Sequence, residues 1–282
     1  MNRTDPLSEA STSLDQLEWR EERGERRKRY IVLGLIFLVL ALISALTLNV
    51  RWDRMGDLQT IIDTIFRFWP PDISTWPDFA GPVLETIMMA LLSTVISMVI
   101  SLPVIVMAAR NINLPFNNLF YGLGRLIIVL SRSIHELVWA LFFVTALGLG
   151  AFPGVLALSV RSIGFVSKMM AESVENIREN EVEAIEATGA NRLQVWVFGI
   201  IPQIIPTLIG IFIFRWDVNL RASTILGVVG AGGIGYHLDL AMSTYNYDEA
   251  SAIILIILIM VGLGEIISSK LREKYVKESE GD

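Results

Sequence analysis

Long apolar runs alternate with short polar segments along the chain, and this pattern predicts helices that cross a membrane. A helix needs about 20 apolar residues to span a hydrocarbon core of about 30 Å. The runs of suitable length cover residues 30–48, 82–109, 119–150, 154–170, 195–220 and 250–267. The third run contains several polar residues, and the sequence leaves open whether it forms one helix or a broken pair. The pattern therefore predicts an all-α integral membrane protein with six transmembrane helices.

The segments around these runs set the predicted domain organisation. Residues 1–29 begin with a polar stretch without apolar periodicity, which favours a disordered cytoplasmic tail, and residues 30–48 form a first transmembrane helix. Residues 49–80 are expected to lie outside the cytoplasm at the membrane interface, because an amphipathic stretch at 58–68 is followed by tryptophan–proline pairs. Residues 81–270 form the transmembrane core, and residues 271–282 form a second cytoplasmic tail.

Basic residues at both ends of the membrane region predict its orientation. Four of them, residues 26–29, precede the first run, and Lys270, Arg272, Lys274 and Lys277 follow the last one. The positive-inside rule keeps such groups in the cytoplasm, so the number of crossings is even. Six crossings satisfy this condition and place residues 174–192 on the cytoplasmic side.

Composition supports a membrane protein and argues against several other classes. The chain is 53% hydrophobic and 18% charged, whereas soluble domains carry about 25% charged residues. It has no cysteine, and its two histidines, His135 and His237, are too far apart in sequence to suggest a metal site. A net charge of −6 argues against general affinity for nucleic acid.

One polar segment between two apolar runs, residues 181–206, carries the strongest functional signal. Its sequence is EVEAIEATGANRLQVWVFGIIPQIIP. Strong helix formers begin it, and Gly189 is placed to end that helix, as glycine does at a C-terminal cap. The chain then turns apolar and contains Pro202 and Pro206. This predicts a short surface helix, a glycine bend and a return into the membrane.

This segment resembles the coupling loop of ABC-importer permeases, whose signature is Glu-Ala-Ala, three residues, Gly, nine residues and Ile-x-Leu-Pro. Glu183, Ala184, Gly189 and Pro202 match it, while Ile185 replaces the second alanine, Gly199 the isoleucine and Ile201 the leucine. The resemblance implies that loop 176–192 docks in a groove of an ATPase subunit. The implied ATPase-coupling residues are Glu183, Ala184, Glu186, Ala187, Gly189 and Pro202. The alternative is an ordinary amphipathic linker between membrane helices.

Other segments are similar to the permeases of phosphonate importers. They are HELVWALFFVTALGLG (135–150), IGFVSKMMAESVE (163–175) and FRWDVNLRASTILGVVGAGGIG (214–235). The resemblance covers residues 81–270 and implies the type I ABC-importer permease fold in the plasma membrane. It also implies a homodimer that works with two cytoplasmic ATPase subunits and an extracytoplasmic phosphonate-binding protein. ATP and Mg would be bound by the ATPase, since this sequence has no G-x-x-x-x-G-K-[ST] phosphate loop.

Charged residues inside the predicted spans are candidate substrate contacts. Arg161 and Arg215 lie roughly 10–14 Å from the ends of their spans at about 1.5 Å per residue, and arginine at such depth is costly unless it faces protein or water. Together with Asn219 and Arg221 they would line a substrate path that attracts an anion, because guanidinium groups match the oxygens of a phosphonate or phosphate. Equally open is a structural role, in which Asp217 or Glu136 neutralises Arg161 or Arg215.

A glycine-rich stretch and a histidine–glutamate pair offer weaker signals. Residues 230–235 satisfy G-x-G-x-x-G, but membrane spans flank them, which argues against a dinucleotide site. Their glycines could allow close helix packing. The family resemblance instead implies a gate formed by Gly230, Gly232, Gly233 and Gly235. His135-Glu136 lacks the second histidine of a zinc-protease motif, because Trp139 occupies that position. No catalytic residues and no metal ligands are predicted.

Taken together, these features predict a non-enzymatic permease subunit of an ATP-driven importer. Its substrates would be phosphonates or related phosphorus oxyanions such as phosphite and phosphate, and alternating access would be driven by the ATPase docked on the coupling helix. A permease for another solute, such as methionine, is a rival within the family. The alternative from a different class is an ion-coupled secondary transporter of an anionic solute, for which charges near the membrane midplane are also typical.

Overall fold

The computed structural model describes residues 6–48, 58–110 and 117–277. The chain divides into two compact units, residues 1–63 and residues 64–282, and each is treated by itself. Within the described residues every regular element is a helix. The predicted all-α class is therefore confirmed.

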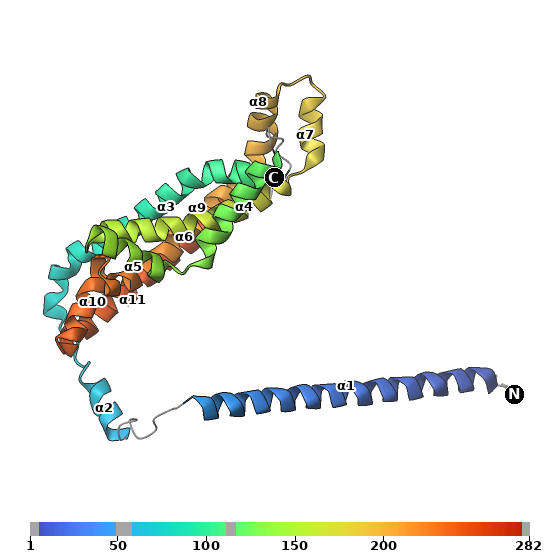
Figure 1. Ribbon diagram of the computed structural model, residues 1–282, viewed down its shortest axis with the longest axis horizontal. Coiled ribbons are helices and arrows are strands. Elements are labelled where there is room, and N and C mark those ends of the chain that lie inside the picture. Colours follow the sequence, from blue (N-terminus) through green and yellow to red (C-terminus); the bar gives the residue numbers. More distant parts are fainter. Residues whose placement is uncertain (1–5, 49–57, 111–116, 278–282) are drawn as a thin grey trace. The chain divides into compact units, whose positions relative to one another are not determined.

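The first unit contains one long helix, α1 (Pro6–Thr47) (Figure 1). Its second half, Arg26–Thr47, is long and apolar enough to cross a membrane, as predicted. The prediction of a disordered tail is wrong for residues 6–29, which belong to the same helix. This segment is rich in glutamate, leucine and arginine, which are good helix formers, and a helix already nucleated by an apolar span extends at little cost. The short helix α2 (Leu58–Phe66), which begins in this unit, coincides with the predicted amphipathic stretch.

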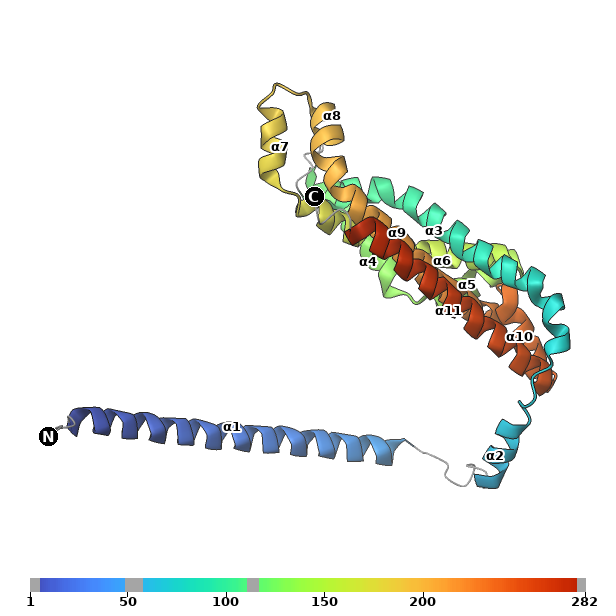
Figure 2. The same cartoon turned by 180° about the vertical axis from the view of Figure 1, so that it is seen from behind.

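The second unit is a bundle of helices packed around α6 (Figures 1 and 2). Its elements are η2 (Ile73–Phe79), α3 (Ala80–Ala108), α4 (Asn117–Ser133), α5 (Glu136–Leu147), α6 (Ala151–Glu175), α7 (Glu179–Glu186), α8 (Arg192–Val195), the π-helical turn η3 (Trp196–Ile200), α9 (Ile201–Leu226), η4 (Gly227–Val229), α10 (Gly233–Ser243) and α11 (Tyr247–Lys277). Helix α6 packs against α3, α4, α5 and α9, and α11 packs against α9. Helices α7 and α8 project from one end of the bundle, and α10 lies at the other end.

The third predicted span is a broken pair. Helices α4 and α5 meet at an angle of 89°. The Nδ1 atom of His135 accepts a hydrogen bond from the backbone N–H of Leu137 at 3.3 Å and caps α5. Five further segments of the described residues are long and apolar enough to cross a membrane, and the bent pair brings the number to six. This agrees with the predicted number of spans.

The residues after the glycine-rich stretch form a helix, although many of them are polar. Helix α10 begins at Gly233 and continues to Ser243. Its inner face consists of Ile234, Leu238 and Ala241, spaced by one helical turn, and these residues pack with α3, α9 and α11. The polar residues between them hide this apolar stripe in the sequence.

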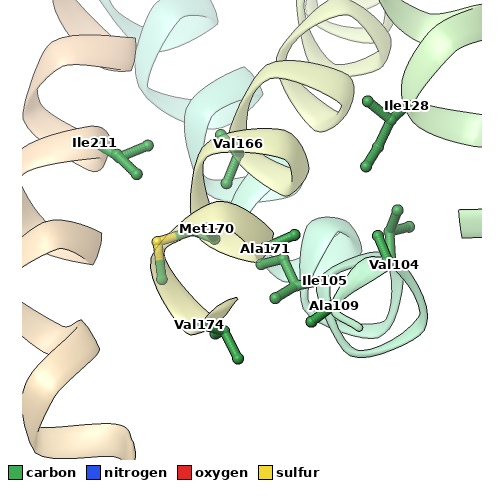
Figure 3. Close-up of a cluster of buried hydrophobic side chains, with 10 residues drawn as sticks. Val104, Ile105, Ala109, Ile128, Val166, Met170, Ala171, Val174 and Ile211 are labelled. Atoms are coloured by element: carbon green, nitrogen blue, oxygen red, sulfur yellow. The ribbon is translucent and has the colours of Figure 1, made fainter. Parts of the chain in front are cut away.

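The centre of the bundle is packed by apolar side chains and by a close approach of two helices at a glycine. Figure 3 shows one apolar cluster, in which Val166 and Met170 of α6 lie between Ile211 of α9 and Ile105 of α3. Beside it, α4 approaches α6 at Gly164, where a Cβ atom would lie 2.6 Å from Oγ of Ser131. That hydroxyl accepts the backbone N–H of Gly164 at 3.0 Å.

Candidate functional site

Helix α7 has one face turned toward the bundle and one face exposed. Val182 and Ile185 are half-buried. Four of the six predicted ATPase-coupling residues are exposed along α7 and its C-cap: Glu183, Ala184, Glu186 and Ala187. The acidic residues Glu179 and Glu181 in its first turn suit the positive end of the helix dipole. The predicted coupling residues of α7 are therefore accessible, while Val182 and Ile185 attach the helix to the bundle.

The end of α7 has the predicted glycine bend. The backbone N–H groups of Ala187 and Gly189 donate to the carbonyls of Glu183 and Glu186, each at 2.9 Å. Gly189 has φ +80°, in the left-handed region that favours glycine, and no other atom lies within 4 Å of the position its Cβ would take. A larger residue at position 189 would therefore be disfavoured by the backbone conformation and not by a steric clash.

Two of the departures from the coupling-loop signature meet in space. A Cβ atom on Gly199 would lie 3.3 Å from Cδ1 of Ile185 and 3.7 Å from Cα of Val182. In the signature a small alanine takes the place of Ile185 and a large isoleucine takes the place of Gly199. In this chain the large side chain lies on α7 and the small residue on η3, the reverse of the signature.

Gln203 is a positioning residue that the sequence analysis missed. Its side-chain oxygen accepts the backbone N–H of Arg178 at 2.8 Å, and its amide donates to the carbonyl of Gly199 at 2.8 Å. It therefore joins the start of α7 to the start of α9. Pro202 lies beside it in the first turn of α9 and contributes to a pocket of about 440 Å³ with Arg178 and Glu181.

A clasp of four residues closes the end of the bundle from which α7 emerges. Glu175, the last residue of α6, accepts hydrogen bonds from the backbone N–H of Arg110 at 2.9 Å and from Nη2 of Arg125 at 3.0 Å. Nε of Arg110 donates to the hydroxyl of Tyr121 at 2.9 Å, and this bond raises the pKa of Arg110. Charges distant in sequence form this clasp, and the sequence offered no signal for it.

Arg161 and Arg215 lie on the neighbouring helices α6 and α9, and Arg161 contacts a carboxylate. Nε of Arg161 lies 3.3 Å from Oε2 of Glu136. Nε of Arg215 donates to Oγ of Ser162 at 2.7 Å, and its guanidinium lies 5.4 Å from the centre of the Phe165 ring. Arg215 is buried, and its bond to Ser162 places it beside the residue that follows Arg161. Pairing of Arg161 with Glu136, one of the open alternatives, is therefore present in this conformation.

Asn219 is fully buried and joins three helices. Its amide donates to Oγ of Ser93 at 3.2 Å and to Oγ1 of Thr94 at 2.9 Å, both on α3. Its side-chain oxygen accepts from the hydroxyl of Ser162 on α6 at 3.1 Å. In this conformation the polar groups of Asn219 are all engaged with protein, so contact with substrate, which was predicted, requires the network to open.

Arg221 lies apart from the other two arginines. It pairs with Asp217 one turn earlier on α9. Six residues separate it from Arg215, which places it about 120° around the helix. The structure thus divides the predicted substrate path into one group, Arg161 with Arg215, and a separate pair, Arg221 with Asp217.

The predicted gate glycines combine unusual backbone angles with tight packing. Gly230, Gly232 and Gly233 have φ values of +84°, +76° and +68°. A Cβ atom on Gly235 would overlap the carbonyl oxygen of Thr224. The stretch is attached to α3, because Glu85 and Thr86 accept two of its backbone N–H groups, those of Gly233 at 3.2 Å and Ile234 at 2.8 Å. These contacts support close packing, and a gating role stays a prediction.

Comparisons with known proteins agree with this architecture. Residues 83–273 match the family described as binding-protein-dependent transport system inner membrane component. The phosphite transport system permease protein PtxC of Stutzerimonas stutzeri is 39% identical over 262 residues, which cover 92% of this chain and 91% of that protein. The phosphate-import permease protein PhnE of Mycolicibacterium smegmatis is 36% identical over 211 residues, covering 74% of this chain and 39% of that protein.

A solved structure has the same fold. A chain of the MetNI methionine ABC transporter in an inward-facing conformation superposes with a TM-score of 0.59 at 23% identity, covering 70% of this chain and 95% of that chain. The core therefore has the type I ABC-importer permease fold. The chain belongs to the family of inner membrane components of binding-protein-dependent transport systems and is a multi-pass membrane protein.

Proposed function

We propose that this protein is the permease subunit of an ATP-driven importer for phosphorus oxyanions, in which α7 receives the movement of a separate ATPase. The observation that carries the proposal is α7 itself. Glu183 and Ala184 of the coupling signature are exposed on it, its other face packs against η3, and Gln203 fixes its start to α9. A push on α7 is thereby transmitted to α9, the helix that carries Arg215 and Asn219.

The proposed assembly has two copies of this chain, two copies of an ATPase that binds ATP and Mg, and an extracytoplasmic binding protein. Both termini are cytoplasmic, which places α7 on the side where ATP is available. Binding of ATP would close the ATPase pair and switch the permease between inward-open and outward-open states. Family membership favours this mechanism over an ion-coupled secondary transporter, in which α7 would have no role.

Phosphonate, phosphite or phosphate is the proposed substrate class. Relatives named as phosphite and phosphate permeases support it, and so does the pair Arg161 and Arg215 within the bundle. Guanidinium groups bind tetrahedral oxyanions through parallel hydrogen bonds, which favours this class over a neutral or zwitterionic solute such as methionine.

The test is uptake of phosphite by cells that lack their own importers and express this chain with an ATPase and a binding protein. Gly189→Val should abolish uptake, because a β-branched residue is strongly disfavoured at φ +80° while the exposed coupling face stays unchanged. Gly189→Asn is the matched control, since asparagine tolerates the left-handed conformation, and it should retain most of the uptake.

Membrane levels of each variant and co-purification of the ATPase complete the experiment. Loss of ATPase binding in Gly189→Val together with normal membrane insertion supports coupling through α7. Uptake that persists without the ATPase, or that is the same in Gly189→Val and wild type, overturns the proposed function.

A further inference from the structure

A pocket with basic walls lies between α4 and α6. Its volume is about 410 Å³. Four basic side chains and no acidic one line it, together with Ile128, Val129 and Ser133: the basic residues are Arg125, Arg132, Arg161 and Lys168. Of these, only Arg161 belongs to the substrate path that the sequence predicted.

The regular spacing of the four cations follows from the two helices. Arg125 and Arg132 are seven residues apart on α4, and Arg161 and Lys168 are seven residues apart on α6. Seven residues are close to two helical turns, so each pair lies on one face of its helix. The contact between Gly164 and Ser131 brings the two faces together. The pocket is therefore a product of the helix packing and not of flexible surface residues.

The cations of the pocket are incompletely neutralised. Arg125 contacts Glu175 at 3.0 Å, Arg161 contacts Glu136 at 3.3 Å and Lys168 contacts Glu172 at 3.5 Å. Arg132 is exposed and makes no ion pair with any described residue; its backbone carbonyl accepts from Arg161 at 3.4 Å. Each paired cation has donors left over, because a guanidinium carries five N–H groups and an ammonium three.

We propose that this pocket binds a phosphorus oxyanion. Forked guanidinium donors match two oxygens of a tetrahedral anion, and the volume also admits several waters of about 30 Å³ each. Arg215 donates a hydrogen bond to Ser162, the residue after Arg161, and Arg125 contacts Glu175 at the end from which α7 emerges. The pocket thus lies on the way from the intramembrane arginines to that end of the bundle, which makes it the release site for substrate; this last step rests on the proposed function.

The test measures binding of radiolabelled inorganic phosphate to the purified full-length chain in nanodiscs of phosphatidylcholine. Arg132→Gln should weaken binding about tenfold or more, the equivalent of one charge-assisted contact. Arg132→Lys keeps the charge without the fork and should give an intermediate affinity. Arg272→Gln is the matched control, because Arg272 is exposed on α11 outside the pocket, and it should bind as wild type.

An anionic lipid headgroup has the same chemistry as free phosphate, and a second arm separates the two sources. Nanodiscs that contain phosphatidylglycerol are compared with those of phosphatidylcholine alone. If the lipid displaces phosphate from wild type, the pocket is an oxyanion site occupied by the headgroup in an anionic membrane. If phosphate binds equally in both nanodiscs, the free anion is the ligand.

Failure of this inference can be distinguished from failure of the proposed function. Phosphate binding that is unchanged in both Arg132→Gln and Lys168→Gln, or that wild type lacks in both kinds of nanodisc, overturns the site even if ATP-driven uptake is intact. Uptake that is independent of the ATPase overturns the proposed function, while a loss of binding in Arg132→Gln would still establish the site. Thermal unfolding of each variant confirms that the bundle is folded.

Discussion

Helix α7 and the polar centre of the bundle around Asn219 are held in place by different kinds of contact. Helix α7 is attached through two half-buried side chains, Val182 and Ile185, and through the hydrogen bond of Arg178 to Gln203. Asn219 in the bundle centre is fully buried and makes hydrogen bonds to two other helices. The first arrangement can move as a unit with little loss of contact. The second must exchange several hydrogen bonds together.

This difference suggests how the two regions share the work of transport. Buried polar networks are costly when they are partly satisfied, so they favour discrete arrangements over gradual ones. Under the proposed function, a movement delivered to α7 would reach α9 through Gln203 and would be resisted by the Asn219 network until its bonds change partners together. The polar centre would then set the barrier between conformations, and α7 would receive the movement.

The largest effect is expected at the ion pair between Glu136 and Arg161. Glu136→Gln removes the carboxylate that contacts Arg161 and leaves two neighbouring guanidinium groups without it. Breaking a buried ion pair costs about 3–5 kcal/mol, and partial exposure of this pair reduces the expected loss to about 2 kcal/mol. The unfolding temperature in detergent should fall accordingly, and uptake should be lost.

A double substitution shows whether this loss comes from the pair. Glu136→Gln combined with Arg161→Gln removes both charges and should recover most of the stability, while uptake stays low because Arg161 is missing. A double variant that is less stable than the sum of the single variants would contradict the pairing of Arg161 with Glu136.

Local structure that depends on residues near one another in sequence could be predicted. Contacts between residues from distant segments could not. The bend at Gly189 and the exposed face of α7 follow from helix propensity and spacing within one loop. Glu175, Gln203 and Ser162 became significant only when the helices were packed, because each acts on a partner from another segment. The sequence marked Arg161 and Arg215 as unusual because they are charged residues within apolar spans. Which carboxylate lies beside them depends on the angle between α4 and α5, which the sequence left open.

An intermediate effect is expected at the contact between α7 and η3. Ile185→Ala leaves a gap beside Gly199, and Gly199→Ile places extra atoms against Ile185, so each single change should cost about 1–2 kcal/mol. The double variant restores the arrangement of the family signature, with a small residue on α7 and a large one on η3. Its stability and its ATP-driven uptake should return close to wild type.

The number of ATP molecules hydrolysed per phosphite imported provides the measurement for this contact. Both single variants should hydrolyse more ATP for each phosphite transported, because α7 is displaced from η3. A double variant that is more impaired than either single one would show that the two departures from the signature are independent, and that the contact does not depend on the exchanged sizes.

The smallest effect on stability is expected at Glu172, where the charge can be removed with little change in packing. Glu172→Gln breaks an exposed pair with Lys168 one turn away on α6, which is worth about 0.3–0.5 kcal/mol. Because Lys168 then loses its partner, phosphate binding in the pocket between α4 and α6 should become tighter, by a modest factor that decreases with added salt. Glu265→Gln on the exposed face of α11 is the matched control. Unchanged affinity in Glu172→Gln would mean that Lys168 does not contribute to the pocket's charge, whereas opposite changes in Glu172→Gln and Arg132→Gln would show that affinity follows the number of unpaired cations.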